Sequence, residues 1–262
     1  MMNKVLEETI QFLISEAFSK FNLRKFIAIS AGDVRPETKE QEMEMAFSKK
    51  THPEIEYAAK WLPIMSSGAD AGSSREVFAY STSKVLKIAK NKPGIAQNKA
   101  EVEISMKNRN SPFITKIYEY DAKSFKWVIA DLIRPLSNAD FSEKIGIPLS
   151  VFHTVKVLTW SKGHQGVLNW IKSLKRMVTD GEMLMQNSVG LTVKTKDMLA
   201  AALAYSKNKK AVEFMTQFIE FAKTNSIHQG DVVPAHFGET ADGRIVFYDY
   251  GATIDVIRKH YK

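Results

Sequence analysis

The sequence predicts an α+β fold in which a small antiparallel sheet is followed by a mainly helical region. The 262 residues are 44% hydrophobic and 25% charged, the composition of a globular chain with room for one or two domains. Short β-rich runs fall between residues 75 and 133, and after residue 135 hydrophobic residues recur at helical spacing. We therefore expect a helical N-terminal extension over 1–60, a β-rich part over 61–134 and a helical part over 135–262.

The first residues have the pattern of an amphipathic helix. Hydrophobic side chains recur every three or four positions, at Leu6, Ile10, Leu13, Ala17 and Phe21. Acidic residues interrupt this segment, so it contains neither a signal-peptide core nor a membrane span. We expect a cytoplasmic protein, which means the host cytoplasm if a phage encodes it.

The region 61–134 reads as a small sheet carrying one helix. The runs 76–80 and 84–89 are β-rich, and a Ser/Thr turn separates them as in a hairpin. A helix is expected to begin just after Gly94, and two further strands are expected within 111–121 and 125–133. Hairpin-length connections indicate antiparallel strands with the helix on one side of the sheet.

The region after residue 135 has the spacing of several helices. They are expected near 150–161, 167–187, 195–206 and 209–224, with Gly163 and Gly166 between the first two. The last forty residues return to loop and strand, with the sequence ADGR forming a turn between two extended runs.

Composition limits the chemistry. The chain has no cysteine, which excludes disulfides, thiolate zinc sites and cysteine nucleophiles. The net charge of +8 favours polyanionic partners, among them nucleotides, nucleic acids and acidic membranes. Basic clusters occur on the helical segments, but no nucleic-acid motif accompanies them, so solvated helix faces are the simpler interpretation. Their residues are Lys172, Lys175, Arg176, Lys207, Lys209 and Lys210.

The first candidate site feature is the glycine- and serine-rich loop 68–74, followed by Arg75. A flexible loop joined to a strand can offer backbone N–H groups to phosphate oxygens, and glycine permits a close approach. The loop is not a common P-loop, because no Lys-Ser/Thr pair follows it. A plain surface turn is the alternative.

The second feature is Lys87, in the middle of the apolar strand VLKIAK. Its side chain points to the opposite face from Leu86 and Ile88. If that face is buried, the ammonium group needs an anionic partner, and Glu101 and Glu103 on the following helix are the candidates. A solvated lysine on an edge strand is the alternative.

The third feature is a pair of aspartates near the end of the chain. Asp231 lies in the loop GDVVPAHFG, and Asp249 follows the apolar run RIVFY and precedes Tyr-Gly. A carboxylate at the end of a buried strand, beside a glycine, is well placed to hold a cation.

Taken in this order, the motifs over residues 64–253 resemble the protein-kinase-like superfamily, including its small bacterial and phage members and its aminoglycoside-kinase branch. The glycine/serine loop precedes the VLK strand, a helix with a glutamate follows, and Asp249-Tyr250-Gly251 stands in place of Asp-Phe-Gly. The resemblance implies a bilobal protein-kinase-like fold with the nucleotide on the β-rich lobe. It implies an ATP-dependent phosphotransferase of unknown acceptor.

The resemblance also implies a role for each matching residue. Lys87 would contact the α- and β-phosphates of ATP and pair with Glu101, preferred over Glu103 because Ile104 follows it three residues on. Asp231 would orient the acceptor hydroxyl, and Asp249 would hold Mg²⁺. The phosphate loop would comprise Gly68, Gly72, Ser73, Ser74 and Arg75, and backbone groups of Asp131, Leu132 and Ile133 would line the adenine pocket.

Two departures from the family pattern weaken the expectation of catalysis. Gln229 stands where the family has histidine, and His236 stands at the place of the asparagine that is the second metal ligand. Magnesium prefers oxygen ligands, whereas imidazole suits softer metals. The alternative function is therefore a catalytically impaired pseudokinase that binds a protein partner as an interaction or assembly module, such as a phage component.

Overall fold

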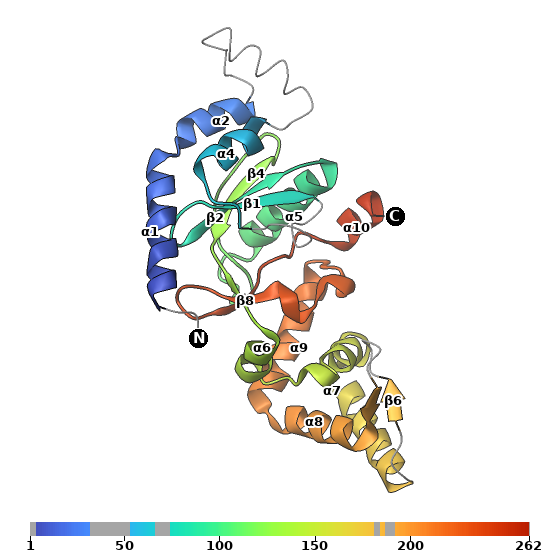
Figure 1. Ribbon diagram of the computed structural model, residues 1–262. Coiled ribbons are helices and arrows are strands. Elements are labelled where there is room, and N and C mark those ends of the chain that lie inside the picture. The colour runs from blue at the N-terminus through green and yellow to red at the C-terminus, as the bar shows by residue number, and fades with distance from the viewer. Residues whose placement is uncertain (1–3, 32–52, 66–73, 181–183, 187–191, 262) are drawn as a thin grey trace. The chain divides into compact units, whose positions relative to one another are not determined.

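The computed structural model describes residues 4–31, 53–65, 74–180, 184–186 and 192–261. The chain divides into two compact units (Figure 1). Unit 1 combines Met1–Arg134 with Thr240–Lys262, and unit 2 is the continuous segment Pro135–Glu239. Unit 1 contains a small antiparallel sheet and unit 2 is mainly helical, which confirms the predicted α+β class.

The sheet of unit 1 has four strands in the order β1-β2-β4-β3. They are β1 (Arg75–Ala79), β2 (Lys84–Ala89), β3 (Ile117–Tyr120) and β4 (Trp127–Asp131). Every neighbouring pair is antiparallel, as predicted, and Lys87 of β2 lies opposite Val77 of β1 and Val128 of β4. Lys87 is therefore on an inner strand of the sheet, not on an edge.

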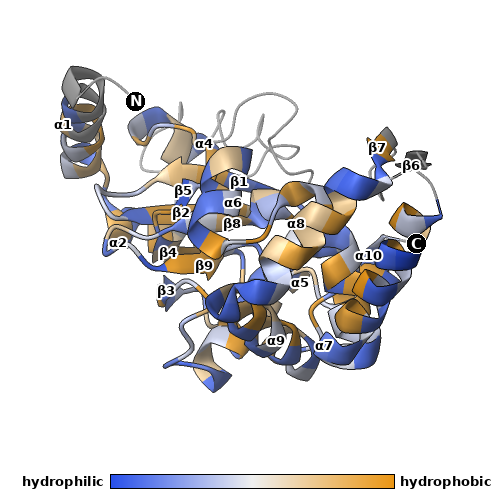
Figure 2. Ribbon diagram, turned by 90° about the horizontal axis from the view of Figure 1, so that it is seen from below, coloured by the Kyte–Doolittle hydropathy of each residue, from blue (hydrophilic) through white to orange (hydrophobic). Residues whose placement is uncertain are grey.

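Helices cover both faces of this sheet. On one face lie α1 (Lys4–Lys20), α2 (Leu23–Ala31) and α4 (Pro53–Trp61). Side chains of α2 and α4 share a core with the strands, and Phe18 of α1 contacts Tyr80 at the edge of this core. That core includes Phe26, Ala58, Phe78, Leu86 and Trp127. The described helices of the predicted N-terminal extension thus form a layer of the sheet unit. Strand β4 is among the hydrophobic parts of the ribbon (Figure 2).

On the other face lies α5 (Lys92–Lys107), whose Val102 packs against Val85 and Val128. The helix begins two residues before Gly94, because the Asn91 side chain accepts a hydrogen bond from the Gly94 N–H and caps the first turn. A β-carbon at Gly94 would lie 2.1 Å from the Ser74 carbonyl oxygen, so only glycine fits this contact between α5 and the start of β1.

Unit 2 is built mainly from helices around an aromatic core. They are α6 (Asn138–Ile145), α7 (Leu149–Thr179), α8 (Thr195–Lys207) and α9 (Lys209–Thr224), with a hairpin of β6 (Leu184–Gln186) and β7 (Thr192–Lys194). Phe141 contacts both Phe152 and Phe237, and Phe218 also contacts Phe237. The predicted helices 195–206 and 209–224 are confirmed.

The predicted break between helices 150–161 and 167–187 is confirmed, but the end of the second helix differs. The segment α7 consists of two helical stretches that meet at a kink at Gly163, which has the non-helical angles φ 63° and ψ −170°. The helix stops at Thr179, and β6 occupies part of the segment predicted as helix.

The C-terminal segment belongs to unit 1 and not with the helical part, where the sequence had placed it. The Phe247 N–H of β9 (Ile245–Phe247) donates to the Phe113 carbonyl at 2.7 Å, and α10 (Ile254–His260) packs on α5. The Tyr261 hydroxyl lies 2.5 Å from that of Ser74. These long-range contacts could not be read from local spacing. Among the described residues, no helix is both long enough and apolar enough to cross a membrane.

Candidate functional site

Lys87 and Glu101 form a buried ion pair at the centre of unit 1. The Lys87 Nζ lies 2.8 Å from Glu101 Oε2, and Glu101 is fully buried on α5. Nζ also donates to the Tyr248 carbonyl at 3.2 Å. Glu103, the other predicted candidate, is exposed and lies 3.8 Å from Lys99. The lysine thus points inward, and its partner is Glu101.

Arg75 joins this ion pair to Asp249. Its Nη1 donates to Glu101 Oε1 at 2.6 Å and its Nη2 donates to Asp249 Oδ1 at 2.5 Å. Nη1 also lies 3.4 Å from the Asn98 side-chain oxygen. Arg75 was predicted to belong to the phosphate loop. The structure instead directs its side chain to two carboxylates, because the first residue of β1 lies beside both α5 and the segment after β9.

We call Arg75, Lys87, Glu101 and Asp249 the charge cluster. Burial by itself would lower the pKa of Arg75, but the charges of Glu101 and Asp249 outweigh it and raise that pKa above its ordinary value. Arg75 therefore stays charged. A buried ion without a partner is strongly unfavourable, so each member of the cluster depends on the others.

The backbone around Asp249 is held by close packing. The Tyr250 side chain is fully buried, and its hydroxyl donates to the Thr115 carbonyl at 3.2 Å. A β-carbon at Gly251 would lie 2.6 Å from the Gln97 carbonyl oxygen of α5, which only glycine allows. The glycine after Asp249-Tyr250 therefore permits the close approach that brings Asp249 to Arg75.

The donor set around Asp249 does not fit the predicted magnesium site. One oxygen of the Asp249 carboxylate already accepts from a guanidinium, and no group of three or more His, Asp or Glu residues in the described chain could hold a metal ion. His236, the other predicted ligand, belongs to unit 2, where its Nδ1 lies 2.7 Å from the Asp231 carbonyl oxygen. We therefore assign no chemical step to a metal ion.

The predicted adenine-binding segment follows β4, and its backbone donors are in use. The Asp131 N–H donates to the Lys116 carbonyl at 3.1 Å, and the Leu132 N–H donates to the Ser83 carbonyl at 2.8 Å. These two N–H groups are thus not available to adenine in this conformation. The expectation concerned all backbone groups of Asp131, Leu132 and Ile133, carbonyls included, so their role at the adenine pocket stays a prediction.

The phosphate loop is only partly described. Gly68, Gly72 and Ser73 lie outside the described residues. Ser74 is buried, its hydroxyl lies 2.5 Å from that of Tyr261, and its carbonyl accepts from the Lys90 N–H at 2.8 Å. The end of the loop is thus anchored to both β2 and the C-terminal segment.

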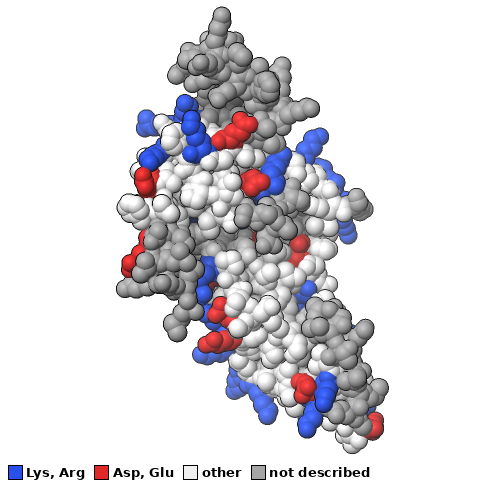
Figure 3. Space-filling model, in the orientation of Figure 1, with Lys and Arg blue, Asp and Glu red and all other residues white. Residues whose placement is uncertain are grey.

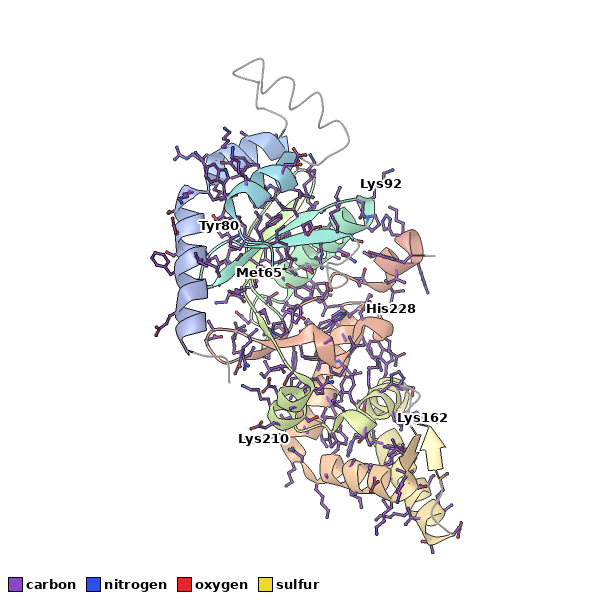
Figure 4. The ribbon with its side chains drawn as sticks, viewed as in Figure 1. Met65, Tyr80, Lys92, Lys162, Lys210 and His228 are labelled. Carbon is purple, nitrogen blue, oxygen red and sulfur yellow. The ribbon has the colours of Figure 1, made fainter. Side chains whose placement is uncertain are left out.

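Unit 2 holds the predicted catalytic loop. Asp231 ends the short 3-10 helix Gln229–Asp231, and its N–H donates to the His228 carbonyl. Because the Asp231 carbonyl can only accept, the 2.7 Å contact with His236 places the proton on the His236 Nδ1. The His228 Nδ1 lies 3.6 Å from Asp231 Oδ2, and Figure 4 labels His228. His236 therefore contacts the backbone of the loop.

Lys156 of α7 is a further residue of this loop region that was not predicted from the sequence. This lysine is buried, and its Nζ donates to the carbonyls of Gln229 and Val232, which flank Asp231, at 3.1 and 2.9 Å. Burial lowers the pKa of Lys156, and the charge of Asp231 opposes that shift. The available signal was its spacing, because Lys156 follows Phe152 by four residues on the buried face of the helix.

Comparisons with known proteins give two structural similarities. No protein-family model matches the chain, and no curated protein does. The structure is similar to APH(2″)-IIia in its GDP and kanamycin complex, with TM-score 0.34 and 14% identity over 78% of this chain and 73% of that one. It is also similar to APH(2″)-IIa in its streptomycin–ATP ternary complex, with TM-score 0.32 and 14% identity over 84% and 72%. Both are aminoglycoside phosphotransferases with a protein-kinase-like fold, a branch that the sequence motifs resemble.

Proposed function

We propose that unit 1 binds the phosphates of ATP at Lys87 and that the chain is an ATP-dependent phosphotransferase. The observation that supports this proposal is the buried Lys87–Glu101 ion pair, because it fixes an ammonium group on an inner strand. A fixed cation of this kind stabilises phosphate oxygens without reorganisation. The predicted loop 68–74 would add backbone N–H groups.

In the proposed reaction, Asp231 orients the acceptor hydroxyl. The bond between the γ-phosphorus and the β,γ-bridging oxygen breaks, and a bond from the γ-phosphorus to the acceptor oxygen forms. The hydroxyl proton passes to the Asp231 carboxylate. Lys156 supports this role, because it fixes the two carbonyls on either side of Asp231.

A nucleotide-binding pseudokinase with a protein partner is the second candidate. Two contacts favour it: Arg75 holds the carboxylate expected to bind the metal, and the Nδ1 of His236 lies against the Asp231 carbonyl. In this function the chain would bind ATP without transferring a phosphoryl group. Both candidates require Lys87 for nucleotide binding, and they differ in the role of Asp231.

The binding test compares Lys87→Met with Lys90→Met by calorimetric titration of ATP. We expect Lys87→Met to weaken binding at least about tenfold, equivalent to about 1.4 kcal/mol. Lys90 is a matched control directly after the same strand, where its Nζ pairs with Glu76 at 3.0 Å. Lys90→Met should change the affinity for ATP less than about twofold, because a partly exposed ion pair contributes little. Equal affinities for all three proteins would reject the proposed site.

The transfer test uses γ-labelled ATP and a mixture of hydroxyl-bearing acceptors. Transfer that Asp231→Asn abolishes supports the phosphotransferase. Transfer that survives this substitution rejects the role of Asp231. ATP binding without any transfer favours the pseudokinase.

A further inference from the structure

Arg75 stands where the kinase-like motifs lead one to expect a metal ion. It is buried, and it connects the glutamate that pairs with Lys87 to the aspartate before Tyr-Gly. Both contacts are short, at 2.6 and 2.5 Å, and each uses a different nitrogen of the guanidinium. A planar guanidinium suits this bridging geometry, whereas a single ammonium group would not reach both carboxylates equally well.

A divalent cation at Asp249 would have to compete with this guanidinium. Magnesium binds carboxylate oxygens at about 2.0–2.1 Å, which would bring it against a positive charge already placed on Asp249 Oδ1. Arginine does not lose its proton in proteins, so it cannot withdraw its charge. Moving the side chain away would also remove one of the two cations that accompany the fully buried Glu101.

The formal charges of the cluster already cancel. Arg75 and Lys87 carry two positive charges, and Glu101 and Asp249 carry two negative ones. A metal ion at this kind of site normally removes the repulsion between an aspartate and the phosphates. Here the Arg75 guanidinium already offsets the charge of Asp249, so an approaching phosphate meets a neutralised carboxylate.

We propose that Arg75 is the resident cation of the Asp249 site and takes the place of a divalent metal ion, so that this chain binds nucleotide triphosphate with little dependence on Mg²⁺. The nucleotide part of this inference rests on the proposed function. The competition between Arg75 and a metal ion at Asp249 does not, and it can be measured without nucleotide.

The first measurement is the affinity for ATP in EDTA and in excess Mg²⁺. For the wild type we expect the two dissociation constants to agree within about threefold, and for Arg75→Met we expect Mg²⁺ to tighten binding at least about tenfold. Lys90→Met, the matched control, should behave as the wild type. A wild type that gains tenfold or more from Mg²⁺ would overturn the inference while leaving the proposed function intact.

The second measurement titrates Mn²⁺ alone into nucleotide-free protein and follows free Mn²⁺ by electron paramagnetic resonance. We expect Arg75→Met to bind Mn²⁺ at least about tenfold more tightly than the wild type, and the further change Asp249→Asn to abolish that gain. Equal Mn²⁺ affinities for wild type and Arg75→Met would overturn the inference. If ATP fails to bind under any condition, the proposed function fails, and this titration still decides the role of Arg75.

Arg75→Met removes a buried charge, so its folding is checked by circular dichroism. If it does not fold, Arg75→Lys replaces it, because lysine keeps the charge but cannot bridge both carboxylates. We expect Arg75→Lys to bind Mn²⁺ at least about threefold more tightly than the wild type. If Arg75→Lys binds Mn²⁺ no more tightly than the wild type, the result counts against the inference. A tenfold or larger gain in wild-type ATP affinity on adding Mg²⁺ would count against it as well.

Discussion

Glu101 is the residue on which two cations of unit 1 converge. Its two oxygens accept from Arg75 and Lys87, and none of its surface is exposed. Glu101→Gln would keep the size of the side chain and remove its charge, which leaves two buried cations with one carboxylate. We expect the free energy of unfolding to fall by about 3–5 kcal/mol, the usual effect of breaking a buried ion pair. Urea denaturation measures this change.

Glu103→Gln is the matched control on the same helix. The Glu103 side chain is exposed and lies 3.8 Å from Lys99, so its loss should change the free energy of unfolding by less than about 0.5 kcal/mol. Similar effects for both substitutions would mean that Glu101 is not the centre of the ion pairs.

Lys156 is a buried side chain that makes two hydrogen bonds to the loop around Asp231, through the carbonyls of Gln229 and Val232. Lys156→Met would leave the carbonyls of Gln229 and Val232 without this donor, at a cost of about 1–3 kcal/mol. We expect faster hydrogen exchange at the loop N–H groups as well. Lys162→Met, on an exposed part of the same helix (Figure 4), should change neither quantity.

Lys156 also predicts a pH dependence. Burial places its folded-state pKa below the ordinary lysine value of 10.5, so between the two values the unfolded chain binds more protons than the folded one. The free energy of unfolding of the wild type should therefore rise, relative to Lys156→Met, as the pH increases through that window toward 10.5. A difference that falls with pH in urea denaturation would contradict this assignment.

At the scale of elements, α5 and the segment after β9 meet at Gly251. Gly251→Ala would place a β-carbon 2.6 Å from the backbone oxygen of Gln97, so the segment that carries Asp249 must move away from α5. We expect a loss of about 1–3 kcal/mol in stability, as for overpacking, together with weaker ATP binding. Gly243→Asn is the control, because no atom lies within 4 Å of a β-carbon there and asparagine tolerates positive φ. An unaffected Gly251→Ala variant would show that this contact does not position Asp249.

Elements with a strong local signal were predicted well. The strand 84–89 was identified with both its ends, since an apolar run is bounded there by turn residues. The start of α5 was misplaced by three residues, because the Asn91 side chain caps the helix ahead of Pro93 and Gly94. The hairpin of β6 and β7 was missed, because its first strand lies in a segment with helical spacing.

The contacts of the candidate site could be predicted only where their residues are close in sequence. Lys87 and Glu101 are close in sequence and lie on adjacent elements, so their pairing could be anticipated. The contact of Arg75 with Asp249 joins residues 174 positions apart, and no local pattern reports it. Lys156 resembles any other helical lysine until its buried partners are known.

At the scale of the whole molecule, unit 2 differs from unit 1 in its chain continuity. Unit 2 is one continuous segment, with its own buried aromatic residues Phe141, Phe152, Phe218 and Phe237. We expect the fragment 135–239 to fold alone, with helical circular dichroism and a cooperative thermal transition. A featureless melting curve for this fragment would show that its core depends on unit 1.

The net charge of +8 is distributed and not concentrated in a patch on the face drawn in Figure 3, where Lys and Arg alternate with acidic and uncharged residues. The predicted basic clusters, on α7 and at the junction of α8 and α9, are exposed, as expected of solvated helix faces. This arrangement gives no support to a nucleic-acid partner.

The composition of unit 1 from two distant segments has a consequence for synthesis. A ribosome completes Arg75, Lys87 and Glu101 long before Asp249, and it makes all of unit 2 in between. Unit 2 can therefore close its core during translation, whereas the sheet unit receives its last carboxylate only when residues 240–262 emerge. A nascent chain that still lacks Asp249 therefore carries one positive charge in excess at the place where the charges of the complete cluster cancel.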